Sequence, residues 1–471
     1  MTEFKLKDYK LGDTIAAIAT FPSKSALGII KISGEKSLPI ISKIFKPARA
    51  KDIKKVKTFT LHYGWIVDKS KTKNKASTEE IIDEVLVSVM RAPATYTKED
   101  VVEISSHGGT IVLNRILEIL LSQGIRLALP GEFTYRALVR GRIDLLQAES
   151  VLAIVEAKTE SILDSVSSQL KGKASSRIKA LKEELKDLFI QTESLINFPE
   201  DLEFSPQGLK KGIENVDKEL KNLIQASSEG KILKEGLRCV ICGKSNAGKS
   251  TLFNLLLGHE RVIVSRIAGT TRDVIEETIN IRGVPLRIYD TAGILEPKDL
   301  VAKKALEKAT AIFKEADLAL LVLDGSRTLD KDDLFLLDKV KNKNTILVIN
   351  KSDLSSRLNF KKLLKIKATK VKMSALKNKG LARLEKAVYD NVYTGDLKRE
   401  DIVFLSQCQR QFLEKAKAST QKIKEYLKNG QTIDFINFEL KAALDSLGKL
   451  SGEVPAEEVL ESIFSQFCVG K

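Results

Sequence analysis

The segment from Gly243 to Ser250 constrains the fold of this chain more than any other feature of the sequence. It reads GKSNAGKS, follows the apolar run Leu237–Cys242 and precedes a helical pattern that begins at Thr251. This spacing of glycine, lysine and serine between a strand and a helix is that of a P-loop, whose backbone N–H groups surround the β-phosphate of a nucleotide. Lys249 is expected to neutralise the β and γ oxygens, and the hydroxyl of Ser250 to ligate Mg²⁺.

Three further motifs follow the P-loop in the order of a guanine-nucleotide site. The first is DTAG, Asp290–Gly293, whose aspartate can reach Mg²⁺ through water and whose glycine can contact the γ-phosphate. The second is NKSD, Asn350–Asp353, and its last carboxylate can accept two hydrogen bonds that guanine offers and adenine does not. The third, Ser374–Leu376, supplies a loop behind the base. Together the four motifs predict GTP as the nucleotide.

The residue after DTAG is Ile294, where many small GTPases carry a glutamine that orients the attacking water. An aliphatic side chain cannot orient water. The side-chain oxygen of Asn246 in the P-loop suits a monovalent cation beside the phosphates, and such a cation would supply positive charge.

The pattern of apolar residues divides the 471-residue chain into several domains. Residues 14–122 show short β-branched strands, such as Leu27–Ile32 and Val85–Val89, which indicate an α+β module. Residues 69–75 are almost without apolar side chains and are expected to form a solvated loop. From Asp144 to Leu195 apolar residues recur at helical spacing without a proline, which predicts one long helix.

Between residues 209 and 394 strands alternate with helices, which is typical of a mostly parallel sheet. A helical pattern returns from Phe412 to Leu427, turns at Asn429 and Gly430, and resumes from Ile436 to Leu447. The predicted fold is therefore multidomain α/β. It has an N-terminal α+β domain (1–122), a helical domain in two parts (123–208 and 395–471), and an inserted P-loop domain of the Ras-like type (209–394).

Composition limits the class of protein further. Lysine and arginine outnumber acids 78 to 62, a net charge of +16, which suits a polyanionic partner such as RNA but also fits a generally lysine-rich chain. No apolar run approaches the roughly 18 residues of a membrane span, and the N-terminus resembles no signal peptide. The four cysteines are too scattered for a disulfide framework, so we expect a reducing, cytoplasmic location. Cys239 and Cys242 lie in one predicted strand and are interpreted as core thiols, and the isolated histidines make a zinc site improbable.

Six segments give the whole chain a family resemblance. They are Tyr96–Asp100, Ser106–Gly109, Pro130–Thr134 with Arg136, Asp144–Glu149, Gly269–Asp273 and Phe467–Lys471. From Asp13 onwards the chain resembles the MnmE (TrmE) family of tRNA-uridine-modification GTPases. The resemblance implies a homodimer with an N-terminal folate-binding domain, and G domains that meet across the dimer when GTP and K⁺ bind. It also implies a flavoprotein partner, MnmG, which carries FAD.

In this family the two proteins install a carboxymethylaminomethyl or aminomethyl-type group at C5 of the tRNA wobble uridine, and formyl-tetrahydrofolate donates the one-carbon unit. The resemblance implies that K⁺ is surrounded by Asn246, Ser265, Ile267 and Thr270, and Mg²⁺ by Ser250 and Thr271. The residues implied to hold the folate are Lys31, Glu103, Arg142 and Lys471. Catalytic roles are implied for Thr271 and Asp290 in GTP hydrolysis and for the thiol of Cys468 in the modification chemistry. The full set of expected nucleotide and cation-loop residues is Asn246, Ala247, Gly248, Lys249, Ser250, Thr251, Ser265, Arg266, Ile267, Ala268, Gly269, Thr270, Thr271, Asp290, Thr291, Ala292, Gly293, Asn350, Lys351, Asp353, Ser374 and Ala375.

The chain departs from the family pattern at several positions. Lys31 stands where arginine is usual and Arg142 where lysine is usual, so charge is kept but hydrogen-bond geometry changes. The early glycine-rich stretch reads FPSKSALG at residues 21–28, which restricts that loop. Arg266 replaces a common acid, and Ala302 stands where the family carries the glutamate that orients the hydrolytic water.

Two other functions fit the same motifs. An RNA- or ribosome-assembly GTPase would use every GTP motif named above as a switch without chemistry on RNA. A degenerate paralogue would bind GTP without modifying tRNA, as Ala302 and the lost glycines suggest. The N-terminal segments and the tail with Cys468 favour the modification enzyme.

Overall fold

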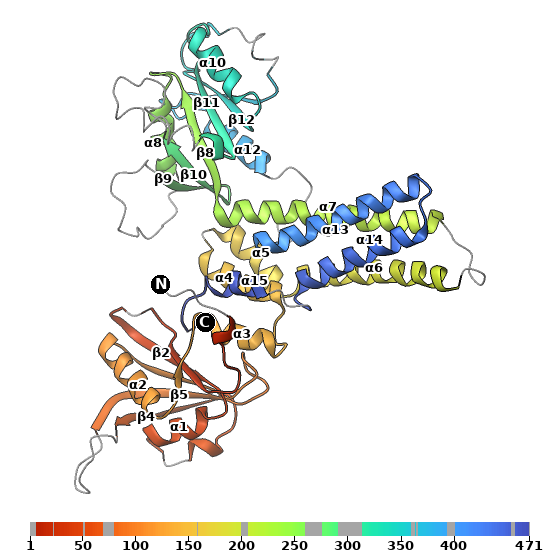
Figure 1. The fold of residues 1–471 in the computed structure, drawn as a ribbon. Coiled ribbons are helices and arrows are strands. Elements are labelled where there is room, and N and C mark those ends of the chain that lie inside the picture. Colours follow the sequence, from red (N-terminus) through yellow and green to blue (C-terminus); the bar gives the residue numbers. More distant parts are fainter. Residues whose placement is uncertain are drawn as a thin grey trace, which may run out of the picture. The chain divides into compact units, whose positions relative to one another are not determined.

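The computed structural model describes residues 6–21, 23–49, 52–68, 80–157, 159–198, 206–259, 276–290, 313–358, 363, 366–392, 401–453 and 457–470. Within them the chain forms two compact units (Figure 1). The first unit comprises residues 1–152, 175–217 and 406–471, and the second comprises 153–174 and 218–405. The predicted loop at residues 69–75 lies outside the described residues.

A seven-stranded sheet forms the centre of the N-terminal part of the first unit. Its order is β3-β4-β5-β6-β2-β1-β7, and only the β1–β7 pair is parallel. The predicted strands at 27–32 and 85–89 lie within β2 and β5, which confirms them. The strands are β1 (Ile15–Ile18), β2 (Ser25–Ser33), β3 (Phe45–Pro47), β4 (Thr60–Asp68), β5 (Glu80–Met90), β6 (Val101–Gly108) and β7 (Arg126–Leu127).

Two helices, α1 (Ser37–Ile44) and α2 (Thr110–Ser122), cover one face of this sheet. Alternate residues of the central strands, Val85, Val87 and Val89 among them, form one buried apolar cluster with these helices. The residues between them point to the opposite face, because side chains alternate along a strand. Leu61, Tyr63 and Leu86 stay exposed there.

The predicted long helix from Asp144 to Leu195 is wrong, because the chain forms three helices. They are α4 (Leu145–Glu156), α5 (Glu160–Leu170) and α6 (Lys173–Asn197). The hydroxyl of Thr159 accepts a hydrogen bond from the N–H of Ile162 and so starts α5. Gly172, with φ of 86°, separates α5 from α6. Both breaks preserve the apolar spacing, which is why the pattern looks continuous.

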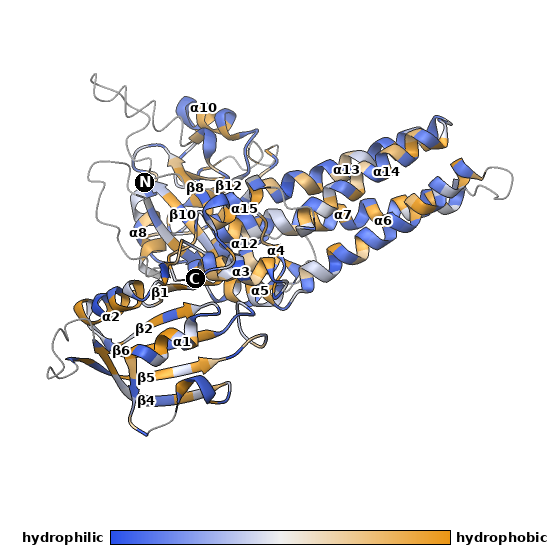
Figure 2. Cartoon of the chain, turned by 60° about the horizontal axis from the view of Figure 1, so that its bottom comes forward, coloured by the Kyte–Doolittle hydropathy of each residue, from blue (hydrophilic) through white to orange (hydrophobic). Residues whose placement is uncertain are grey.

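The predicted C-terminal helix pair is confirmed as α13 (Gln407–Lys428) and α14 (Ile433–Ser451), with the turn at Asn429 and Gly430. Ser406 and Gln409 form a capping box that starts α13. Figure 2 shows apolar residues alternating with polar ones along both helices, as packing on one side requires. The first unit also contains α3 (Glu132–Val139), α15 (Glu457–Phe464) and the short helices η1 (Leu6–Asp8) and η2 (Ile53–Lys55).

The second unit is built on a six-stranded sheet of order β13-β12-β11-β8-β10-β9, in which only β9 is antiparallel to its neighbour. The mostly parallel sheet confirms the predicted α/β class. Its elements are β8 (Leu237–Gly243), α8 (Lys249–His259), β9 (Glu276–Ile281), β10 (Val284–Asp290), β11 (Leu318–Asp324), α10 (Lys331–Val340), β12 (Thr345–Asn350), β13 (Thr369–Lys372) and α12 (Leu381–Val392).

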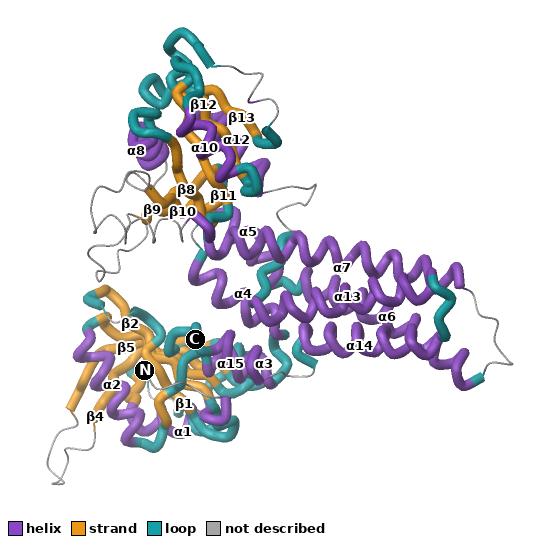
Figure 3. Tube along the Cα trace, turned by 45° about the horizontal axis from the view of Figure 1, so that its top comes forward, coloured by secondary structure: helices purple, strands orange, loops and turns teal. Residues whose placement is uncertain are grey.

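Helices cover both faces of this sheet, as Figure 3 shows. Leu252 of α8 and Leu384 of α12 belong to one apolar cluster, and Leu336 of α10 belongs to the other. Cys239 and Cys242 fall into different clusters and are both buried, which confirms them as core thiols on opposite faces. Burial raises the pKa of the Cys242 thiol to about 12.

A 30-residue helix, α7 (Pro206–Glu235), begins in the first unit and continues into the second. The helix ends at Glu235. Gly236 follows it with φ of 84° and leads directly into β8. The second unit also includes α5, whose Gln169 side chain donates to the carbonyl of Phe404 at 2.9 Å and accepts from its N–H at 2.7 Å. The predicted domain boundary at 208/209 lies inside α7, and the boundaries stay a prediction. No helix in the described ranges is both long and apolar enough for a membrane span.

Candidate functional site

The P-loop connects the carboxyl end of β8 to α8, and its backbone needs glycine at two positions. A Cβ atom on Gly243 would lie 2.4 Å from the carbonyl oxygen of Val322, and one on Gly248 would lie 2.1 Å from Nδ2 of Asn350. Both glycines also have positive φ, 148° and 96°, which other residues rarely adopt. The sequence motif therefore follows from close packing of this loop against the neighbouring strands.

Asn350 links three of the predicted motifs through its side-chain amide. Its Nδ2 donates to the carbonyl of Ala247 in the P-loop at 2.9 Å, and its Oδ1 accepts from the N–H of Ala375 at 2.9 Å. The side chain is buried at 3% exposure, so each of these hydrogen bonds satisfies a polar atom that water cannot reach. One amide thus fixes the distance between the phosphate loop and the loop behind the base.

Asp353 and Ser374 lie together at the end of the site that the sequence predicts to bind the base. A hydrogen bond from Ser374 lowers the pKa of the Asp353 carboxyl, so it is an ionised acceptor at neutral pH. The N–H of Lys377 donates to Oγ of Ser374 at 3.2 Å and orients it. The ammonium of Lys351 contacts Asp324 at 2.7 Å, which holds the intervening loop against β11.

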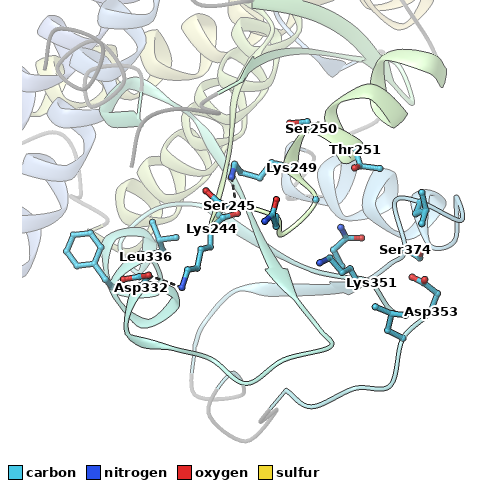
Figure 4. Close-up of a pocket in the computed structure, with 17 residues that line it drawn as sticks. Lys244, Ser245, Lys249, Ser250, Thr251, Asp332, Leu336, Lys351, Asp353 and Ser374 are labelled. Carbon is cyan, nitrogen blue, oxygen red and sulfur yellow. Dashed lines mark hydrogen bonds and ion pairs between the residues drawn. The ribbon is translucent and has the colours of Figure 1, made fainter. Parts of the chain in front are cut away.

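Residues of the P-loop together with Asn350, Lys351, Asp353 and Ser374 line one cavity of about 990 Å³, a volume suited to a nucleotide. Figure 4 shows Asp353 and Ser374 at one end of the cavity, away from Lys249 and Ser250 of the P-loop. The Nζ of Lys249 donates to the carbonyl of Lys244 at 2.9 Å. The cradle of backbone, an ammonium, a hydroxyl and an ionised carboxylate fit a guanine nucleotide with Mg²⁺.

Many of the residues that the sequence singled out around the nucleotide lie outside the described part of the chain. They are Ser265, Arg266, Ile267, Ala268, Gly269, Thr270, Thr271, Thr291, Ala292, Gly293, Ile294 and Ala302. Asp290 ends β10, but its side chain is not described. Of the residues proposed to surround the cations, Asn246 and Ser250 line the cavity.

The predicted folate residues Lys31 and Glu103 lie opposite each other on β2 and β6. The Nζ of Lys31 is 3.4 Å from the carboxylate of Glu103 and 5.7 Å from the centre of the Phe133 ring. Arg142 is exposed. Burial raises the pKa of the Tyr96 hydroxyl, and the hydrogen bond with Thr134 and the charge of Arg142 offset part of this rise. A cation and a carboxylate suit the acids and the hydrogen-bond donors of a folate, whereas the Phe133 ring is fully buried.

The C-terminal tail reaches the same part of the first unit. The carbonyl of Cys468 accepts a hydrogen bond from the N–H of Gly131 at 3.2 Å, and the side chain of Cys468 is exposed. A Cβ on Gly131 would lie 2.9 Å from Phe467, and one on Gly470 would lie 2.7 Å from the carbonyl of Ile18. The tail therefore packs closely against the start of α3 and the end of β1. Lys471 lies outside the described residues.

The sequence interpretation missed a buried ion-pair network behind this region. Arg136, fully buried, contacts Asp13 at 2.6 Å, Glu132 at 2.9 Å and Glu99 at 3.1 Å. Glu99 also accepts a hydrogen bond from Ser33 at 2.6 Å. Three charged residues within two of the family segments, Glu99, Glu132 and Arg136, thus hold the sheet, the loop before β6 and α3 together. Their presence in those segments was the one available signal.

Comparisons with known proteins cover nearly the whole chain. The model of the family "GTP-binding protein TrmE N-terminus" matches residues 14–142, and that of the "MnmE helical domain" matches residues 145–468. The chain belongs to the MnmE family. A tRNA modification GTPase MnmE from Thermoanaerobacter pseudethanolicus is 45% identical, with 98% of this chain and 99% of the relative covered. The tRNA modification GTPase MnmE of Clostridioides difficile is 42% identical, with 98% and 100% covered.

Proposed function

We propose that this protein is the GTP-hydrolysing subunit of a complex that modifies the wobble uridine of tRNA at C5. The group added is of the carboxymethylaminomethyl or aminomethyl type. As a member of the MnmE family, the chain is a GTPase involved in tRNA modification. Family membership is the observation that carries the modification part of the proposal. The guanine site, in which Asn350 joins the P-loop to the loop of Asp353 and Ser374, supports the GTPase part.

Each described residue of the guanine site has a definite task in GTP binding. Asp353 accepts hydrogen bonds from the guanine, and the backbone of residues 243–250 surrounds the phosphates. With GTP bound, the Nζ of Lys249 would exchange the carbonyl of Lys244 for phosphate oxygens, and the hydroxyl of Ser250 would hold Mg²⁺. We place K⁺ next to Asn246, where it supplies the positive charge that an arginine provides in other GTPases.

The one-carbon donor is proposed to bind beside Lys31 and Glu103. When bound, formyl-tetrahydrofolate supplies the carbon that is transferred. Glu103 would accept hydrogen bonds from the pterin, and Lys31 and Arg142 would face the glutamate carboxylates of the folate. The tail that carries Cys468 contacts Gly131, next to α3. FAD belongs to the partner MnmG, and family membership supports that partnership.

The protein is further proposed to be a cytoplasmic homodimer. On the second face of the N-terminal sheet, the exposed side chains of Leu61, Tyr63 and Leu86 support a dimer interface. All four cysteines are free, which suits a reducing compartment.

Mass spectrometry of wobble nucleosides tests this function directly. Cells that lack the protein should lose the C5-modified uridine and accumulate its unmodified precursor, and a plasmid copy should restore it. An unchanged nucleoside profile in the deletion strain would refute the modification role and favour a GTPase switch. A plasmid copy carrying Lys249→Ala serves as the matched negative control, because it removes the phosphate-binding ammonium.

A further inference from the structure

A second cavity of about 610 Å³ lies in the second unit, between strand β13 and helix α12. It shares no lining residue with the nucleotide cavity. All four residues of β13 line it, and α12 contributes one face that includes Arg383 and Lys386. Since β13 is an edge strand of the sheet, this groove opens along the border of the unit.

Positive charge dominates the groove. Its lining includes four cations, Lys370, Lys372, Arg383 and Lys386, but only one carboxylate, Asp390. The segment 366–392 as a whole carries seven lysines and arginines and two acids, and one of these acids, Glu385, contacts Arg282 at 3.8 Å. The local excess of cations therefore attracts an anion.

The ammonium of Lys370 is held by backbone carbonyls, whereas two cations of α12 are exposed. The Nζ of Lys370 donates to the carbonyls of Ile366 and Ala368 at 2.9 and 3.0 Å, so two of its three N–H bonds are used and its position is fixed. Arg383 and Lys386 are exposed and three residues apart on α12, which places them on the same side of the helix. Thr369 and Asn391 add neutral polar groups.

The lining favours a nucleic-acid backbone over an acidic protein. Protein interfaces are enriched in aromatic residues and methionine and depleted in lysine, whereas phosphates are contacted by lysine, arginine, threonine and asparagine. The groove has the second composition and contains no aromatic residue or methionine among its described lining residues. We propose that this groove binds the phosphate backbone of an RNA, and this rests on the proposed function, in which tRNA is the substrate.

The full-length double variant Arg383→Glu/Lys386→Glu tests the proposal. Binding of unmodified tRNA transcript is measured by fluorescence anisotropy at several KCl concentrations. Fewer phosphate contacts mean that fewer counterions are released when the protein binds tRNA. Affinity should therefore fall about tenfold or more, and the slope of log affinity against log salt should shrink by about two. The matched control Lys339→Glu/Lys341→Glu makes the same charge change at the C-terminal end of α10, outside the lining of both cavities, and should keep the wild-type slope.

Equal affinities and slopes for the groove variant and the control variant would overturn the assignment. Retained GTP binding shows that a variant is folded, and the neutral variant Arg383→Gln/Lys386→Gln replaces the double glutamate variant if that one does not fold. A wild-type protein that binds no tRNA would refute both the groove and the proposed substrate. A wild-type protein that binds tRNA, together with a groove variant that binds it equally well, would refute the groove alone. Competition by polyglutamate as strong as by tRNA would also overturn the RNA assignment, in favour of an acidic protein.

Discussion

Asp353 is the carboxylate that we propose selects guanine over adenine. It is ionised because Ser374 donates a hydrogen bond to it, and it lines the nucleotide cavity. An asparagine of the same size would present an N–H group to the N–H groups of guanine, so donors would face donors. Selectivity at this position therefore depends on one atom that accepts rather than donates.

We predict that Asp353→Asn weakens GTP binding by more than about tenfold, because a hydrogen bond is lost and a donor is left unpaired. Isothermal titration measures the change. Xanthosine triphosphate, which carries an oxygen where guanine has its amine, should bind the variant better than GTP. The control Asp332→Asn removes a carboxylate that contacts Lys244 in the same cavity and should leave the preference for GTP over xanthosine triphosphate intact. Unchanged GTP affinity in Asp353→Asn would contradict the assignment.

At the scale of elements, the P-loop packs closely against Val322 and Asn350 of the neighbouring strands. Asn246 has φ of 63° and lines the cavity beside Ser250. We predict that GTP hydrolysis is several-fold faster, at least about threefold, in KCl than in NaCl, because K⁺ near Asn246 supplies charge to the transition state. Steady-state phosphate release in the two salts tests this, with Asn246→Ala expected to lose the difference. Equal rates for the wild type would count against a K⁺ site.

The tail that follows α15 provides the second prediction at this scale. Cys468→Ser should abolish tRNA modification and leave GTP hydrolysis unchanged, because the exposed thiol lies on the first unit while the nucleotide cavity lies on the second. Nucleoside analysis after complementation and a phosphate-release assay measure the two activities. Cys408→Ser, which alters a half-buried cysteine of α13, is the matched control. Full modification by Cys468→Ser would refute the role of the thiol.

The sequence predicts elements well where apolar runs end at turn residues, as at β8, β12 and the pair α13 and α14. It fails where a helix is interrupted without a change in apolar spacing, as at Thr159 and Gly172. The sequence pattern also does not indicate α7 and α15 as separate helices. Contiguous motifs bring Asn350, Asp353 and Ser374 to one cavity as expected. The ion pairs of Arg136 could not be predicted, because its contact Asp13 is 123 residues away in the chain.

At the scale of the whole molecule, assembly concerns the face of the N-terminal sheet on which Leu61, Tyr63 and Leu86 are exposed. The register places Tyr63 opposite Leu86, and it places Glu103 opposite both Ser88 and Lys31, on one face. Lys31 and Glu103, two of the candidate folate residues, therefore lie on the same face of the sheet as exposed apolar side chains. A second copy of the chain on this face would bury those side chains and lie next to Lys31 and Glu103.

We predict that Leu86→Glu weakens dimerisation by about tenfold or more, because it places a charge in a surface that must lose water. Sedimentation equilibrium measures the association. Ile111→Glu is the matched control, since Ile111 is 86% exposed on α2, which covers the opposite face of the sheet. Both variants should bind GTP like the wild type. A dimer of unchanged strength in Leu86→Glu would exclude this face as the interface.

The close contact between Gly131 and Phe467 has a consequence for the order in which the chain can fold during synthesis. The first unit needs residues from before 152 and from after 406, whereas the sheet of the second unit lies wholly between residues 237 and 372. The ribosome therefore releases the complete nucleotide sheet while the surroundings of Gly131 and Ile18 still lack their last side chains. Nascent chains of this protein should acquire GTP binding before the thiol of Cys468 has reached its position.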